Sequence, residues 1–191
     1  MVIQNRVREL YRERKPSFGT YITIQTPLAV EAAAAAGMDF VRIDSYKHRY
    51  NPENLDNMIR TSLSYGVTPW VRCKNDAWDI MQALDNGALI VSMKVNTAED
   101  ARAAVAATYY PPRGVREPSR AKRHKSMPAD QYLDWYNDQI LVSLQLESPG
   151  ALENYREIVK VEGADIIQFG KHGFAAALGI SMDLARHSSG P

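Results

Sequence analysis

Several charged and polar side chains stand directly after short apolar runs. The segment IDSYKHR (43–49) places a carboxylate, a phenol, an ammonium, an imidazole and a guanidinium within six residues. Further apolar runs end in VRCKND (71–76), QLES (145–148) and GKHG (170–173). Carboxylates, imidazoles and amines exchange protons, and guanidinium groups stabilise negative charge. Whether 43–49 is a charged surface loop or the rim of a site depends on the elements that position it.

Strand-like and helix-like patterns alternate along the chain. Short β-branched and aromatic runs predict strands at 18–24, 40–44, 68–73, 89–95, 140–148 and 164–170. Helical patterns follow them at 28–37, 52–66, 77–87, 97–109, 149–161 and 172–179. Glycines close several of these helices, a proline opens 52–66, and Thr97 with Asp100 resembles a capping box. Repeated βα units predict a parallel sheet with helices outside it.

This α/β alternation fits either an open doubly wound sheet or a closed (β/α)8 TIM-type barrel. No Gly-rich dinucleotide fingerprint follows the first strand, which weakens the doubly wound alternative. In a barrel the reactive residues lie at the C-terminal ends of the strands. Those ends carry Asp44, Arg72, Glu147 and the GKHG segment here, whereas the strands that precede them are apolar. The sequence therefore predicts a TIM-barrel-like parallel barrel with a polar site at that end.

The composition indicates one globular domain in a reducing compartment. With 191 residues, 45% of them hydrophobic, the chain can fill a core, and we expect one barrel domain at 1–180 and a polar tail at 181–191. A net charge of +1 and the short RAKRHK segment (120–125) indicate neither nucleic-acid nor membrane binding. Cys73 is the single cysteine, and no signal peptide or bilayer-spanning run is apparent, so a cytoplasmic location is expected.

Five segments carry a resemblance to a known family: AAAGMDFVRID (34–44), PWVRCKND (69–76), TAEDARAAVAATYYPPRGVR (97–116), NDQILVSLQLES (137–148) and VEGADIIQFGKHGFAAALG (161–179). The combination of YPPRGVR with the later QLE is the more specific signal. Over residues 6–180 the chain resembles the HpcH/HpaI aldolase/citrate lyase family, the class II pyruvate aldolases built on phosphoenolpyruvate/pyruvate-binding barrels.

The resemblance implies aldol cleavage or addition on a 2-oxo acid, such as a pyruvate-derived 4-hydroxy-2-oxo acid, through an enolate. In the family, a glutamate and an aspartate hold a divalent metal, which an oxygen-rich site would select as Mg²⁺ or Mn²⁺. An arginine holds the enolate oxygen. A histidine oriented by an aspartate exchanges protons together with a metal-bound water.

Several family roles carry over to single positions of this sequence. By this resemblance Glu147 matches the metal-binding glutamate and Arg72 the enolate-binding arginine. The alternative is that the two are merely ion-pair partners at a barrel mouth. Asp44 matches the aspartate that orients the histidine, and Asp76 matches a loop residue whose role is less defined.

The segment after Asp44 departs from the family pattern. The family has aspartate, any residue, glutamate, histidine, whereas this chain has DSYKH, with Tyr46 in place of the glutamate. Lys47 takes the histidine position and His48 follows it. A one-residue bulge would return His48 to its place. Alternatively, Lys47 is the acid or base, with a pKa lowered by burial beside Arg72. A third interpretation makes both residues solvated loop cations.

The segment GKHGF also departs from the family's GPxDL. Gly173 stands where the metal-binding aspartate is expected, so we expect metal binding to be weak or lost. His172 and Gly173 would contact the substrate, and His172 could also offer a ring nitrogen to a metal. Lys171 would place an ammonium beside Glu147. Ser92 replaces a proline that is usual at the end of the fourth strand.

The C-terminus is the last departure. Family barrels continue beyond the position of Gly179 through an eighth strand and helices exchanged between subunits, so we expect a shortened barrel that forms a homo-oligomer. We favour a carbon–carbon lyase acting on a 2-oxo acid. The alternative is a catalytically degenerate barrel that binds a small carboxylate or supports oligomerisation. A further alternative is a Schiff base between the 2-oxo acid and Lys47 or Lys171.

Overall fold

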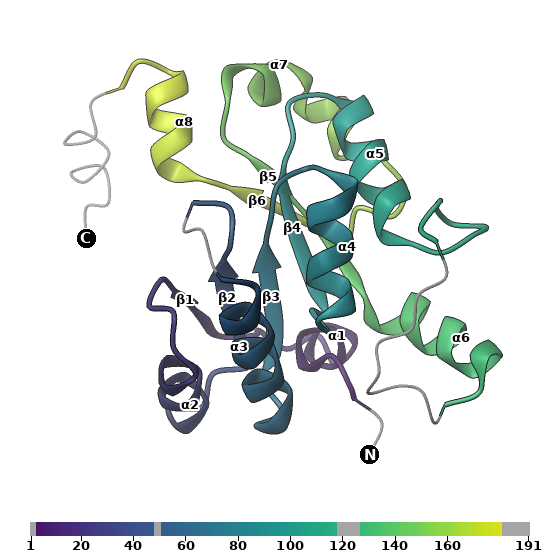
Figure 1. Cartoon of the computed structure of the whole chain (residues 1–191). Coiled ribbons are helices and arrows are strands. Elements are labelled where there is room, and N and C mark those ends of the chain that lie inside the picture. Colours follow the sequence, from purple (N-terminus) through teal and green to yellow (C-terminus); the bar gives the residue numbers. More distant parts are fainter. Residues whose placement is uncertain (1–2, 48–50, 118–126, 181–191) are drawn as a thin grey trace.

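The computed structural model describes residues 3–47, 51–117 and 127–180 of the chain (Figure 1). His48, the basic segment 120–125 and the tail 181–191 therefore lie outside the described residues. Within the described ranges, no helix has the length and apolar character that crossing a bilayer requires.

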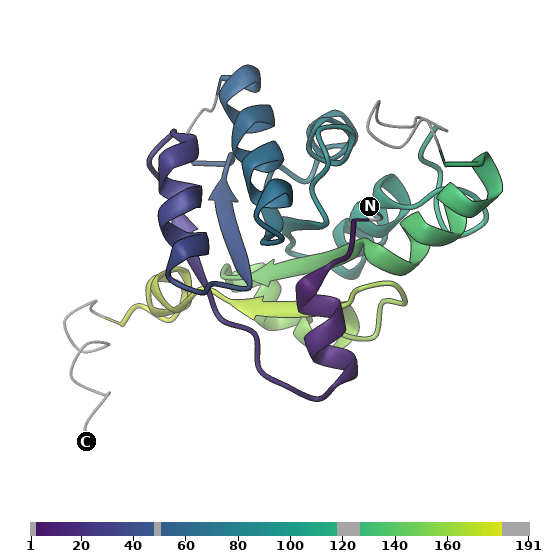
Figure 2. The ribbon, with the colours of Figure 1, turned by 90° about the horizontal axis from the view of Figure 1, so that it is seen from below.

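Six strands of the described residues form one parallel sheet whose spatial order follows the order along the chain. Their bounds are β1 (Gly19–Ile22), β2 (Phe40–Asp44), β3 (Thr68–Arg72), β4 (Ile90–Lys94), β5 (Leu141–Leu146) and β6 (Ile166–Phe169). All pairs of neighbouring strands are parallel. The sheet curls into part of a barrel, which Figure 2 shows from below. The predicted TIM-barrel-like α/β fold is thus confirmed.

Eight helices accompany the strands in the described part of the chain. Their bounds are α1 (Arg6–Arg12), α2 (Pro27–Ala35), α3 (Pro52–Ser64), α4 (Ala77–Asp85), α5 (Ala98–Thr108), α6 (Ala129–Gln139), α7 (Pro149–Ile158) and α8 (Lys171–Ala177). The expected helices are present with slightly shorter bounds, whereas α1 and α6 were not predicted. Figure 1 shows α2 to α5 following one another around the outside of the sheet.

Local signals explain where these helices begin and end. Prolines occupy the first turns of α2, α3 and α7, where the missing N–H has no helical partner. Gly37 and Gly66 follow α2 and α3 with φ of 80° and 71°, a left-handed conformation that glycine adopts without strain. The capping box of Thr97 and Asp100 forms at the start of α5 as predicted.

The two faces of the strands serve different purposes. Alternate residues of a strand face opposite sides of the sheet. On one side, Val41, Ile43, Val71, Val91 and Met93 are fully buried and belong to the main apolar core. The residues between them carry many of the polar and charged side chains of the sheet. The apolar face therefore packs against the helices outside the sheet, and the opposite face supplies polar side chains that can form a site.

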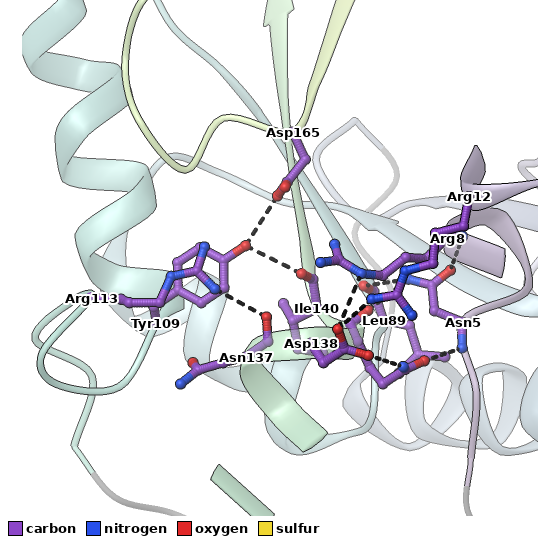
Figure 3. Close-up of polar contacts among 11 residues, drawn as sticks. Asn5, Arg8, Arg12, Leu89, Tyr109, Arg113, Asn137, Asp138, Ile140 and Asp165 are labelled. Carbon is purple, nitrogen blue, oxygen red and sulfur yellow. Dashed lines mark hydrogen bonds and ion pairs between the residues drawn. The ribbon is translucent and has the colours of Figure 1, made fainter. Parts of the chain in front are cut away.

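The end at which the strands begin is closed by α1. Val7 of this helix packs with Trp70, Ile90 and Leu141 in a second apolar cluster. Asn5, which caps α1, is completely buried. Its side-chain amide donates hydrogen bonds to the carbonyl oxygens of Leu89 (3.2 Å) and Gln139 (2.8 Å). Figure 3 labels Asn5 and Leu89. The candidate site therefore lies at the opposite end, where the strands finish.

Candidate active site

Charged side chains converge where the strands finish. Asp44, Arg72 and Lys94 are the last residues of β2, β3 and β4, and Glu147 directly follows β5. The sheet register pairs Asp44 with Arg72, and Lys94 with Gln145. The sequence-based expectation that Asp44, Arg72 and Glu147 lie together therefore agrees with the structure. This is the end of a parallel barrel where active sites are found.

Arg72 links the two carboxylates of the cluster. Its Nη1 donates to Asp44 Oδ2 and its Nη2 to Glu147 Oε1, both at 3.1 Å. The Arg72 side chain is only 4% exposed, so these ion pairs are shielded from water. The Tyr46 ring lies over the guanidinium, with 4.9 Å between its centroid and Arg72 Cζ. Tyr46 thus covers one face of the Arg72 guanidinium.

Asp44 also shapes the turn that follows β2. Its Oδ1 accepts the backbone N–H groups of Tyr46 (3.2 Å) and Lys47 (3.0 Å). The Lys47 side chain is exposed, so the burial beside Arg72 that would have made it an acid or base is not found. His48, the other acid–base candidate, lies outside the described residues.

The carboxylate of Glu147 has donors on both oxygens. Oε1 accepts from Arg72 and lies 3.6 Å from Lys94 Nζ. Oε2 accepts from Gln145 Nε2 at 2.6 Å. Because Gln145 lies two residues before Glu147, the two side chains share one face of the chain. The glutamate is thus held by two hydrogen-bond donors and one further ion pair of this chain.

A second polar layer lies below the first, around Arg42 of β2. Its Nη2 donates to Ser92 Oγ (3.0 Å) and to Gln145 Oε1 (2.8 Å). Burial first, and then the nearby Arg72 guanidinium, lower the pKa of Arg42 to about 10, although Asp44 and Glu147 oppose this shift. Arg42 therefore stays charged at neutral pH. Ser92 serves as one of its hydrogen-bond partners.

The first turn of α8 packs closely against Glu147. A Cβ atom added at Gly173 would lie 2.6 Å from Glu147 Cβ and 2.6 Å from its backbone oxygen. An aspartate at this position would therefore require α8 to move away. His172 is exposed. Lys171 is exposed as well, and in the described part of the chain it forms no ion pair with Glu147.

The expectation that Lys171 pairs with Glu147 is thus wrong. A lysine ammonium does lie beside Glu147, but it is that of Lys94.

Asp76 has a structural role, because its side chain caps α4 by accepting the N–H groups of Trp78 and Asp79. The sequence analysis missed Lys94, Gln145 and Arg42 as site residues. Strand alternation carries a signal for them, because each lies two positions before or after a polar residue already noted in the same predicted strand: Ser92, Glu147 and Asp44.

The carboxylate oxygens of this cluster do not form a suitable ligand set for a hard divalent cation. Mg²⁺ and Mn²⁺ are held by several oxygen atoms with free lone pairs. Here both Glu147 oxygens and both Asp44 oxygens already face N–H groups of this chain. Lys94 adds a positive charge beside Glu147. Among the described residues, no group of three His, Cys, Asp or Glu side chains is placed to hold a metal.

Comparisons with known proteins show which family the chain resembles. The sequence model of the HpcH/HpaI aldolase/citrate lyase family matches residues 79–187. A 4-hydroxy-2-oxo-heptane-1,7-dioate aldolase of Salmonella dublin is 32% identical over 186 residues, which are 94% of this chain and 70% of that protein. The aldolase of the same name from Escherichia coli (strain SE11) is 33% identical over 184 residues, covering 93% of this chain and 69% of the relative.

Solved structures show the same likeness. The crystal structure of an HpcH/HpaI aldolase from Desulfitobacterium hafniense DCB-2 superposes with a TM-score of 0.87 at 26% identity, covering 94% of this chain and 71% of that one. Macrophomate synthase superposes with a TM-score of 0.82 at 22% identity, which shows a shared fold.

Proposed function

Because the chain belongs to the HpcH/HpaI aldolase/citrate lyase family, we propose that it is a carbon–carbon lyase that cleaves a 4-hydroxy-2-oxo acid into pyruvate and an aldehyde. The observation that carries this proposal is the buried Arg72, held between Asp44 and Glu147 where the strands finish. The names of the relatives support aldolase-type chemistry and give no support to the catalytically degenerate alternative.

The chemistry requires a positive group where negative charge develops. A base removes the proton of the 4-hydroxyl group, the C3–C4 bond breaks, and its electron pair moves into the enolate of pyruvate. A proton then returns to C3. Arg72 donates to Asp44 and Glu147 through one nitrogen each, so further N–H groups of its guanidinium are available for the enolate oxygen. In a site shielded from water, such a contact stabilises the transition state more than the ground state.

The proposal is tested by following pyruvate release. The chain is incubated with 4-hydroxy-2-oxoheptane-1,7-dioate and, separately, with oxaloacetate, in parallel samples that contain EDTA, Mg²⁺ or Mn²⁺. A coupled lactate dehydrogenase assay reports pyruvate. We expect release from at least one substrate above the rate without protein. Absence of release from both substrates under all three conditions would refute the lyase function.

We assign the proton transfer to the segment that follows Asp44, with His48 as the acid–base residue. Lys47, which is exposed and precedes His48 in the sequence, is the matched comparison. Replacing His48 with alanine should lower kcat about 100-fold, the lower range for a lost general acid or base. Lys47→Ala should leave kcat nearly unchanged. The opposite pattern in steady-state kinetics would assign the proton transfer to Lys47.

We also propose that the protein forms a homo-oligomer. β1 and β6 are the edges of the described sheet, and large apolar side chains lie exposed near both. Phe18, just before β1, is 65% exposed, and Phe169, at the end of β6, is 61% exposed. Such surface is costly to leave in water. Light scattering at micromolar concentration should give a multiple of 21.4 kDa. A homogeneous monomer would contradict this prediction.

A further inference from the structure

Lys94 is a charged residue of the site for which the family pattern offers no role. It ends β4, and its Nζ lies 3.6 Å from Glu147 Oε1, an oxygen that Arg72 also contacts. The Lys94 side chain is 34% exposed, whereas that of Arg72 is 4% exposed. The ammonium therefore contacts the buried cluster and still has N–H groups open to an incoming molecule.

The balance of charge in the cluster favours an anion. Arg42, Arg72 and Lys94 bring three positive charges, and Asp44 and Glu147 bring two negative charges, which leaves one positive charge. The oxygens of both carboxylates are already occupied by donors of the chain. An arriving cation would have to compete with these donors and would meet a net repulsion, whereas the carboxylate of a 2-oxo acid would neutralise the excess charge.

We propose that Lys94 takes over the electrostatic role of the divalent cation in this site, so that the chain binds the carboxylate end of its 2-oxo acid through Lys94 and Arg72 without a metal ion. This inference rests on the proposed function for the identity of the ligand. A bound metal would attract the carboxylate and the 2-oxo oxygen. Here an ammonium and a guanidinium on neighbouring strands offer charge-assisted hydrogen bonds to the same kind of oxygen atoms.

The space beside Glu147 supports the replacement. The close approach of Gly173 to Glu147 leaves no room for a carboxylate side chain on that side, as a Cβ there would already be within 2.6 Å. Lys94 approaches Glu147 from β4 instead. The chain thus lacks the second anionic ligand at 173 and has a cation against the remaining one. Both departures lower the expected affinity of the site for a metal ion and raise its expected affinity for an anion.

The test is a calorimetric titration of oxalate, a planar mimic of the pyruvate enolate, into the metal-stripped full chain in the presence of EDTA. We expect saturable binding in EDTA and no tighter binding in EDTA-free buffer that contains excess Mg²⁺. We also expect no binding heat when Mg²⁺ or Mn²⁺ alone is titrated into the metal-stripped chain in EDTA-free buffer. Lys94→Met should weaken oxalate binding by about tenfold or more, because the strong hydrogen bond of a charged donor is lost. Lys94→Arg should retain most of the affinity, since it keeps the charge.

Lys160→Met is the matched control, because Lys160 pairs with Glu157 at 2.9 Å on the exposed surface, and it should bind oxalate like the unmodified protein. Circular dichroism establishes that each variant is folded, and Lys94→Gln serves if Lys94→Met is not. Oxalate binding that requires Mg²⁺ or Mn²⁺, or equal binding by the folded Lys94 variants that lack the charge, would overturn the inference.

The inference and the lyase function fail separately. Oxalate binding through Lys94 in EDTA, combined with no cleavage of any substrate, would refute the lyase function and keep the inference. Cleavage and oxalate binding that both require added metal would keep the lyase function and refute the inference.

Discussion

Replacing Arg72 with methionine should reduce kcat/KM for pyruvate release about 1,000-fold, in the range seen when one preorganised donor to a developing oxyanion is removed. At this position the guanidinium is buried and already aimed by Asp44 and Glu147, so it needs no reorganisation during the reaction. Methionine fills similar space but cannot donate a hydrogen bond. The pyruvate assay described above measures the effect.

Arg72 also supports the fold, which the experiment must separate from its chemical role. Its loss leaves two shielded carboxylates without their shared cation, and breaking such a buried pair costs about 3–5 kcal/mol. Arg72→Lys keeps the charge but cannot donate to both carboxylates with the same geometry, so it should fold and still lose most activity. Arg60→Met, which removes an exposed pair with Asp56 on α3, is the control and should keep full activity. Near-normal kcat/KM in folded Arg72→Lys would contradict the proposed role.

Replacing Asn5 with alanine should lower the free energy of unfolding by about 3 kcal/mol, the scale expected when buried hydrogen-bonding groups lose their partner. The Asn5 side chain satisfies the carbonyl oxygens of Leu89 and Gln139 and also caps α1 (Figure 3). The carbonyl of Leu89 keeps the backbone N–H of Leu141 as a donor, whereas that of Gln139 loses the side-chain amide at a buried position. Urea denaturation followed by circular dichroism measures the change.

A surface variant on the same helix gives the comparison for Asn5→Ala. Arg12 pairs with Asp138 at the protein surface, with its side chain 54% exposed. Arg12→Ala should therefore cost less than about 1 kcal/mol, as exposed ion pairs usually do. Equal destabilisation by both variants would show that Asn5 contributes only through the helix cap and not through the closure of the barrel.

Much of the fold was predictable because each strand carries its own local signal. β2 has the expected bounds, and the glycines after α2 and α3 marked their ends correctly. The helices α1 and α6 were missed for physical reasons. α1 has only seven residues, several of them charged, and α6 begins after Pro128 without a side-chain cap. Both are stabilised by packing against distant parts of the chain, which a local pattern does not contain.

The candidate site was predictable as far as it lies at strand ends. Asp44, Arg72 and Glu147 converge as expected, because parallel strands finish at the same edge. Lys94 was overlooked in favour of Lys171, because the sequence shows which lysines are near a motif but not which direction their side chains take. Lys171 opens α8 and is exposed, whereas the register of β4 with β5 brings Lys94 to Glu147.

The order of the strands has a consequence for how this chain folds during synthesis. Because each strand pairs with the one that precedes it in the chain, every new βα unit finds its docking edge already made when it leaves the ribosome. Low sequence separation of such contacts favours fast folding. The contacts of Asn5 with Gln139 belong to a smaller set that joins distant parts of the chain, since they span 134 residues. The first helix to be translated must therefore wait for most of the sheet before it seals the barrel, which makes closure of that end a late folding event.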